Sequence, residues 1–86
     1  MTAAMVSEIH RRLTLALQPT ALEVIDEGHK HAGHGNAGKG HFHVRIVSSA
    51  FVDVTPIKRH RLVYAAVAEL MDQGIHALSI DAKTPG

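Results

Sequence analysis

The side chains of this sequence with the clearest capacity for chemistry are its histidines. The chain has eight histidines and no cysteine among 86 residues, and five of the eight fall within "HKHAGHGNAGKGHFH", residues 29–43. Imidazole is the commonest metal-binding side chain in proteins. Without thiolates, any metal chemistry must use imidazole and carboxylate ligands, or take sulfur from another molecule.

The first half of this stretch holds three histidines that are close enough in sequence to share a metal ion. His29 and His31 are two residues apart and would project to the same side of an extended segment, with His34 nearby. The alternative is a solvated, glycine-rich connector, in which the histidines have no common target. Spacing alone leaves both interpretations open.

Two nucleotide-related motifs overlap the same stretch. Residues 33–40, "GHGNAGKG", match the G-x-x-x-x-G-K of a phosphate-binding loop, but Gly40 stands where a Mg²⁺-binding Ser or Thr is required. Residues 35–38, "GNAG", match the GXXG loop of KH modules, which clamps the nucleic-acid backbone. Both motifs need a helix after the loop, whereas an alternating strand is expected from His41, so both matches are interpreted as accidental.

Two further candidates lie in the second half of the chain. Lys58, Arg59, His60 and Arg61 occupy the first turns of an expected helix, where positive charge opposes the helix dipole. This arrangement suggests a surface for phosphate, carboxylate or an acidic partner, although a merely solvated helix end is the alternative. His76 is expected to begin a strand, and the plain interpretation is a partly buried ring satisfied by backbone groups.

These residues must be positioned by five elements. Apolar residues at four-residue spacing predict a first helix, and strict alternation in "HFHVRIVS" predicts a strand with one buried face. Thr55-Pro56 is typical of a helix start and Gly74 of a helix end. The five predicted elements are a helix over about 3–17, a strand over about 21–26, a strand over about 41–48, a helix over about 56–73 and a strand over about 76–83. A loop over 27–40 joins the first two strands.

Length and composition predict one domain, spanning residues 1–86, with a modest core. The element order predicts an α+β fold, α-β-β-α-β and class II KH-like, with a three-stranded mixed sheet and both helices packed on one face. The net charge of +1 provides no general attraction to nucleic acid or membrane. No signal peptide or membrane span is evident, so a cytoplasmic protein is expected.

Four segments, in this order and with these gaps, resemble the BolA family across about residues 5–85. They are "LEVIDEGHKHAGH", "HFHVRIVSSAF", "RHRLVYAAVAEL" and "IHALSIDAKTP". The resemblance implies the same α-β-β-α-β fold, similar to class II KH domains. No nucleophile–base pair or acid–base pair of carboxylates stands out in the sequence, so a protein without enzymatic activity is expected.

The resemblance implies a partner and a cofactor as well. BolA-like proteins pair with monothiol glutaredoxins, and the heterodimer can hold a [2Fe-2S] cluster ligated by the glutaredoxin cysteine, glutathione and BolA histidines. The family histidine before the "AL" of the last strand corresponds to His76. The loop His or Cys corresponds by position to His31, with His29 and His34 as alternatives. Imidazole must be deprotonated to ligate, so cluster retention is expected to weaken on acidification.

The implied role is iron–sulfur cluster maturation or iron and redox-stress regulation. An alternative role for the family is a stress-responsive transcription regulator that binds DNA through its KH-like fold and the basic second helix. A further alternative is a stand-alone metal-binding module built on the His-rich loop.

Overall fold

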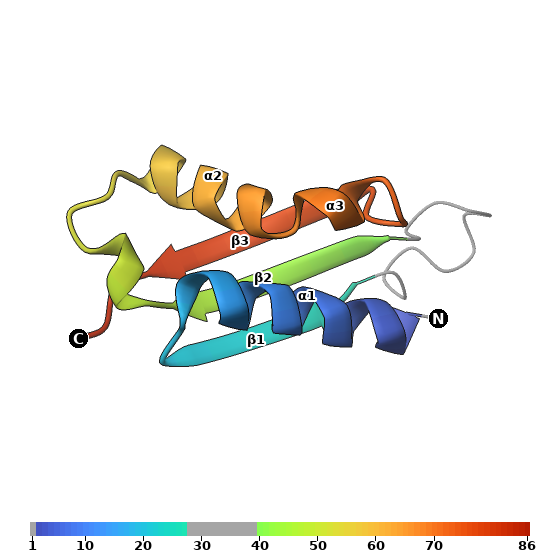
Figure 1. Cartoon of the computed structure of the whole chain (residues 1–86), viewed down its shortest axis with the longest axis horizontal. Helices are drawn as coiled ribbons and strands as arrows, with labels where there is room; N and C mark the ends of the chain where they lie inside the picture. Colours follow the sequence, from blue (N-terminus) through green and yellow to red (C-terminus); the bar gives the residue numbers. More distant parts are fainter. Residues whose placement is uncertain (1, 28–39) are drawn as a thin grey trace.

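The structure of this protein is a computed structural model, which describes residues 2–27 and 40–86. Figure 1 shows the helices lying across the sheet. The elements are α1 (Thr2–Leu17), β1 (Ala21–Asp26), β2 (His41–Val47), the short 3₁₀ helix η2 (Ser49–Phe51), α2 (Pro56–Ala66), α3 (Ala68–Met71) and β3 (Ala77–Lys83).

The sheet has the strand order β1-β2-β3, with β1 antiparallel and β3 parallel to the central strand. The parallel pair is joined through η2, α2 and α3, as a parallel connection requires a crossover. Both long helices lie on the same side of the sheet (Figure 1). The predicted α+β, α-β-β-α-β fold with a three-stranded mixed sheet is confirmed.

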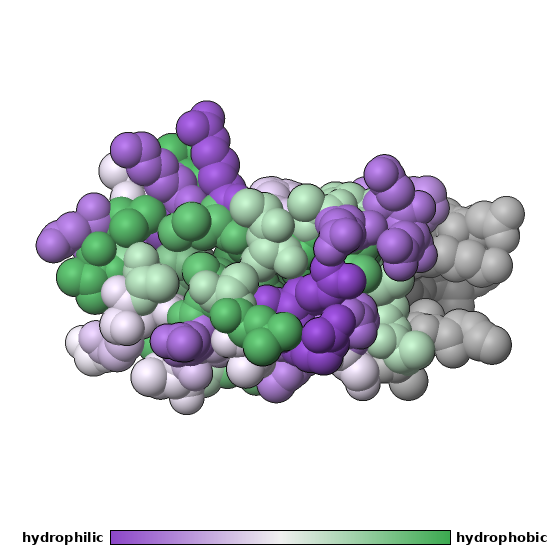
Figure 2. Space-filling view, in the orientation of Figure 1, coloured by the Kyte–Doolittle hydropathy of each residue, from purple (hydrophilic) through white to green (hydrophobic). Residues whose placement is uncertain are grey.

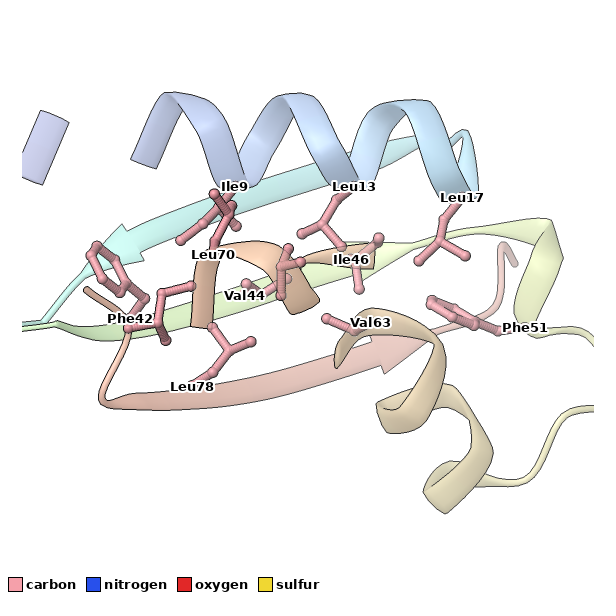
Figure 3. Packing of buried hydrophobic residues seen from close by; sticks show 12 residues of the cluster. Ile9, Leu13, Leu17, Phe42, Val44, Ile46, Phe51, Val63, Leu70 and Leu78 are labelled. Carbon is pink, nitrogen blue, oxygen red and sulfur yellow. The ribbon is translucent and has the colours of Figure 1, made fainter. Parts of the chain in front are cut away.

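The core lies between this sheet and the helices (Figure 3). Strand β2 contributes every second side chain, since Phe42, Val44 and Ile46 are at most 2% exposed. Helix α1 contributes residues at four-residue spacing, and each fully buried apolar side chain stabilises the fold by about 1.5–3 kcal/mol. The other buried members of the core are Ile9, Leu13, Leu17, Phe51, Val63, Val67, Leu70, Ile75 and Leu78.

The helix predicted over 56–73 is divided at Val67. Val67 has φ −113° and ψ 15°, outside the helical region, and its N–H is shared between the carbonyls of Val63 and Tyr64. Val67 is fully buried, and Leu70 in α3 is only 2% exposed. No Gly or Pro marks the break, so the local sequence does not predict it. The chain then turns through Gly74, at φ +135°, toward β3.

Two strand boundaries also differ from the prediction. Ser48 leaves β2 to cap η2, and its buried hydroxyl donates to the carbonyl of Leu17 at 2.6 Å and accepts from the N–H of Ala50 at 3.0 Å. Strand β3 begins at Ala77, so His76 lies just before the strand and does not share a strand face with Leu78.

A charged link joins α1 to α3. The Nε of Arg12 donates to Glu8 at 2.9 Å within α1, and its Nη1 donates to Glu69 of α3. Figure 2 shows hydrophilic residues gathered where these two helices face each other. Because the side chain of Glu69 is 77% exposed, this ion pair adds little to stability, and α3 is held mainly by its buried residue Leu70.

The ion pairs of Glu8 with Arg11 and Arg12, both within α1, predict a specific acid response. Hydrogen bonds from Arg11 and then Arg12 lower the pKa of Glu8 from 4.5 to about 2. Because the folded-state pKa lies below the unfolded one, the stabilisation is present above pH 4.5 and is lost as the pH falls toward 2. An NMR titration of the Glu8 carboxyl carbon is expected to show this low midpoint, and Glu8→Gln should lose less stability across that range. A midpoint near 4.5 would contradict the ion pairs of Glu8 with Arg11 and Arg12.

Candidate functional site

The ends of the His-rich segment and His76 meet at one end of the sheet. At the start of the segment, the N–H of Glu27 donates to the carbonyl of His41 at 2.8 Å. At its end, the carbonyl of Gly40 accepts from the N–H of His76 at 2.8 Å and from that of Ala77 at 3.2 Å. The backbone of His76 is therefore bonded directly to the residue at which the segment returns to the sheet.

Gly40 makes this junction possible. It is buried, has φ +74°, and a Cβ built on it would lie 2.1 Å from the carbonyl oxygen of Gly74 and 2.9 Å from the nitrogen of His76. Those separations are shorter than van der Waals contact, so no side chain fits there. Strand β2 follows immediately, at His41, so the phosphate-loop match at this glycine lacks the helix that such a loop requires.

The side chain of His76 is exposed, although the residue before it, Ile75, is 5% exposed and belongs to the core. The interpretation of His76 as a partly buried ring is therefore wrong. Ile75 and the bond to Gly40 hold the backbone on both sides of an imidazole that faces solvent. An exposed imidazole on a fixed backbone can offer a ring nitrogen to a metal centre carried by another molecule.

The three loop candidates, His29, His31 and His34, lie outside the described residues. Within residues 2–27 and 40–86, no three His, Asp or Glu side chains converge on a point that would hold a metal ion. A metal centre that uses His76 thus needs ligands from the 28–39 segment or from a second molecule.

The four basic residues at the start of α2, residues 58–61, differ in what their side chains contact. Arg59 is half-buried, and its guanidinium donates to the carbonyl of Val54 at 2.8 Å and to that of Ala82 at 3.2 Å. Lys58, His60 and Arg61 are exposed, and Figure 2 shows hydrophilic side chains projecting from the first turns of α2. Arg59 thus ties the start of α2 to the end of β3, and the surface charge comes from Lys58 and Arg61.

Replacing Arg59 with alanine is expected to lower the free energy of unfolding by about 1.5–3 kcal/mol, because charged hydrogen bonds to two carbonyls are lost. Arg61→Ala is the matched control, since Arg61 is exposed on the same helix and should change stability by less than about 0.5 kcal/mol. Urea unfolding of both variants measures the difference. Equal losses would contradict the structural role of Arg59.

Sequence reasoning missed Gly40 and the inward contacts of Arg59. Gly40 is one glycine in a glycine-rich stretch, and nothing local distinguishes it from its neighbours. The position of Arg59 near a helix start is equally typical of a solvent-facing cation. Both roles depend on contacts with residues far along the chain, at Gly74 and Ala82.

None of the helices in the described part of the chain combines the length and the apolar run needed to cross a bilayer.

The sequence model of the family described as "BolA-like protein" matches residues 13–86. Among relatives, the chain is 45% identical over 84 residues to "SufE-like protein 1, chloroplastic/mitochondrial" of Arabidopsis thaliana, with 90% of this chain and 23% of that protein covered. It is 44% identical over 77 residues to "BolA-like protein 1" of Homo sapiens, covering 90% of this chain and 56% of that protein.

Solved structures agree with these matches. The BolA domain of SufE1 from Arabidopsis thaliana superposes with a TM-score of 0.84 at 46% identity, covering 94% of this chain and 92% of the domain. The solution structure of BolA1 from Mus musculus superposes with a TM-score of 0.78 at 43% identity, covering 93% and 64% of the two chains. The chain spans about a quarter of the plant SufE-like protein and about half of the human one. It belongs to the BolA family.

Proposed function

We propose that this chain is a non-enzymatic adaptor that pairs with a monothiol glutaredoxin and shares a [2Fe-2S] cluster with it. This chain would supply two ligands. One is His76, and the other is a histidine of the loop, for which His31 is the leading candidate and His29 and His34 are the alternatives. The role would be iron–sulfur cluster maturation or iron and redox-stress regulation. The supporting observation is the bond between His76 and Gly40, which holds an exposed imidazole where the His-rich segment ends.

The histidines of this chain could supply two of the four protein and glutathione ligands that such a cluster needs. With no cysteine in the sequence, its sulfur ligands must come from the glutaredoxin cysteine and from glutathione carried by that partner. Two imidazoles in place of two thiolates on one iron is the Rieske pattern, which raises the reduction potential of the cluster. His76 would supply one of these imidazoles to the partner's cluster, and Gly40 and Ile75 hold the backbone of His76 in position.

The test mixes the chain with a monothiol glutaredoxin, glutathione, iron and sulfide under anaerobic conditions. We expect absorption and circular dichroism spectra that differ from those of the cluster-bound glutaredoxin homodimer, and a heterodimer on size-exclusion chromatography. His31→Ala, His29→Ala and His34→Ala, measured separately, identify the loop ligand as the variant that removes the new spectrum. A mixture whose spectrum is that of the homodimer alone would contradict the proposal.

A second candidate function, binding DNA as a transcription regulator, is supported by one observation. Lys58 and Arg61 are exposed on the first turns of α2. Binding through phosphates is steeply salt-dependent. Each of Lys58→Ala and Arg61→Ala should therefore reduce, by about one, the slope of the logarithm of the DNA-binding constant against the logarithm of the salt concentration. A complex that ignores salt, or none at moderate ionic strength, would remove this function.

The location of the protein and a stand-alone metal role for its His-rich loop both stay predictions. Cytoplasmic location was expected from the sequence, whereas the plant relative carries the words "chloroplastic/mitochondrial" in its name. Metal binding by the loop would involve only residues outside the described part of the chain.

A further inference from the structure

The open face of the sheet carries a second pair of histidines. His41 and His43 lie two residues apart on β2, and both are half-buried. The residues next to them along the strand, Phe42 and Val44, are buried toward the helices. Because successive side chains of a strand point to opposite faces, both histidines lie on the face that the helices leave uncovered.

The register of the sheet gives this pair suitable neighbours. On β3, His41 is opposite Ala77 and His43 is opposite Ser79, so only small side chains flank the two rings on that side. On β1, Ile25 is opposite His43 and presents an apolar side chain. Residues two apart in a strand are separated by about 6.7 Å, a span over which two imidazoles can turn toward one ion between them.

We propose that His41 and His43 form a two-imidazole chelate for a late first-row divalent cation, with Cu²⁺ bound more tightly than Ni²⁺ or Zn²⁺. Imidazole suits these ions, and their affinity for nitrogen sites peaks at Cu²⁺. No third His, Asp or Glu completes the site among the described residues, so the remaining coordination positions are open to water or an external ligand. The site uses neither His76 nor the 28–39 segment, so it is independent of the cluster proposal.

Charged pairs on the open face border the site, and they include Asp81 of β3, which lies opposite Arg45 and pairs with Lys83 at 3.8 Å. Arg45 follows His43 on the same face, and its guanidinium donates to Glu23 of β1 at 3.4 Å. The positive charge of Arg45 opposes cation binding, and the Glu23 carboxylate offsets it. Since both side chains of this pair are more than half exposed, the effect on affinity is small.

The test is a Cu²⁺ titration of the full chain carrying His29→Ala, His31→Ala and His34→Ala, which removes competition from the loop. We expect one Cu²⁺ per chain by calorimetry, with nitrogen coupling in the electron paramagnetic resonance spectrum. Adding His43→Ala should weaken Cu²⁺ binding at least about tenfold. His10→Ala, a change at an exposed histidine on α1, should leave it unchanged. Equal affinity with and without His43, or equal losses for His76→Ala and His43→Ala, would overturn the proposal.

A rescue variant separates chelation from a general effect on the strand. In the same background, His41→Ala removes one ligand, and Arg45→His then restores a histidine two residues from His43 on the same face. We expect the first change to weaken Cu²⁺ binding and the double change to recover most of it, with circular dichroism verifying the fold of each. A folded double variant that binds Cu²⁺ no better than His41→Ala would contradict the two-imidazole chelate.

Discussion

Replacing Gly40 with alanine is expected to destabilise the protein by about 3 kcal/mol or more, the largest effect of any single substitution proposed for this chain. The added methyl group would lie 2.1 Å from the Gly74 carbonyl oxygen, and the residue would be forced to keep φ +74°. The backbone at Gly40 must then move away from His76. The bonds from His76 and Ala77 to the Gly40 carbonyl would be strained or lost.

Gly86→Ala is the matched control for this substitution. A Cβ at Gly86 meets no atom within 4 Å and nothing holds its φ in place, so this control is a glycine-to-alanine change without the clash and without a fixed positive φ. Denaturant unfolding measures both variants, and amide exchange of His76 and Ala77 reports on the junction. If Gly40→Ala costs no more than Gly86→Ala, the close approach of Gly40 and Gly74 is wrong.

The second large effect is expected from His76→Ala, in function rather than in stability. His76 is exposed, so its removal should change the free energy of unfolding by less than about 0.5 kcal/mol. If it ligates the shared cluster, however, the mixed complex with glutaredoxin should retain its cluster at least about tenfold less well. The loss is measured by absorption and circular dichroism of the reconstituted complex after gel filtration.

His10→Ala provides the comparison, because His10 is also exposed but lies on α1 and is no candidate ligand of the cluster. It should keep the spectrum of the unmodified complex. Read together, Gly40→Ala tests how His76 is positioned and His76→Ala tests what its ring does. A His76→Ala complex that keeps the same spectrum and the same cluster content would remove His76 from the ligand set.

Much of the fold is predictable from the sequence because its cause is local. The alternation in β2 and the four-residue spacing in α1 each arise from one buried face. The break at Val67 and the departure of Ser48 from β2 are not predictable in this way. Val67 leaves the helical conformation where its side chain enters the core, and Ser48 turns away from the strand where its hydroxyl reaches Leu17.

The candidate site is predictable in its residue types and less so in its arrangement. The sequence indicates His76 as a candidate and the resemblance gives it a role, but its exposure depends on how Ile75 and Gly40 hold the turn before β3. The pair His41 and His43 is visible in the sequence as two surface residues. Its interest emerges only from the register, which sets Ala77 and Ser79 beside it.

The most direct test of the central proposal is to look for nitrogen on the iron. The chain is labelled with ¹⁵N-histidine, reconstituted with unlabelled monothiol glutaredoxin and glutathione, reduced, and examined by pulsed electron paramagnetic resonance. The proposal predicts ¹⁵N couplings from two imidazoles, one of which disappears in His76→Ala. A reduced cluster that shows no ¹⁵N coupling from this chain would contradict histidine ligation, and with it the shared cluster proposed here.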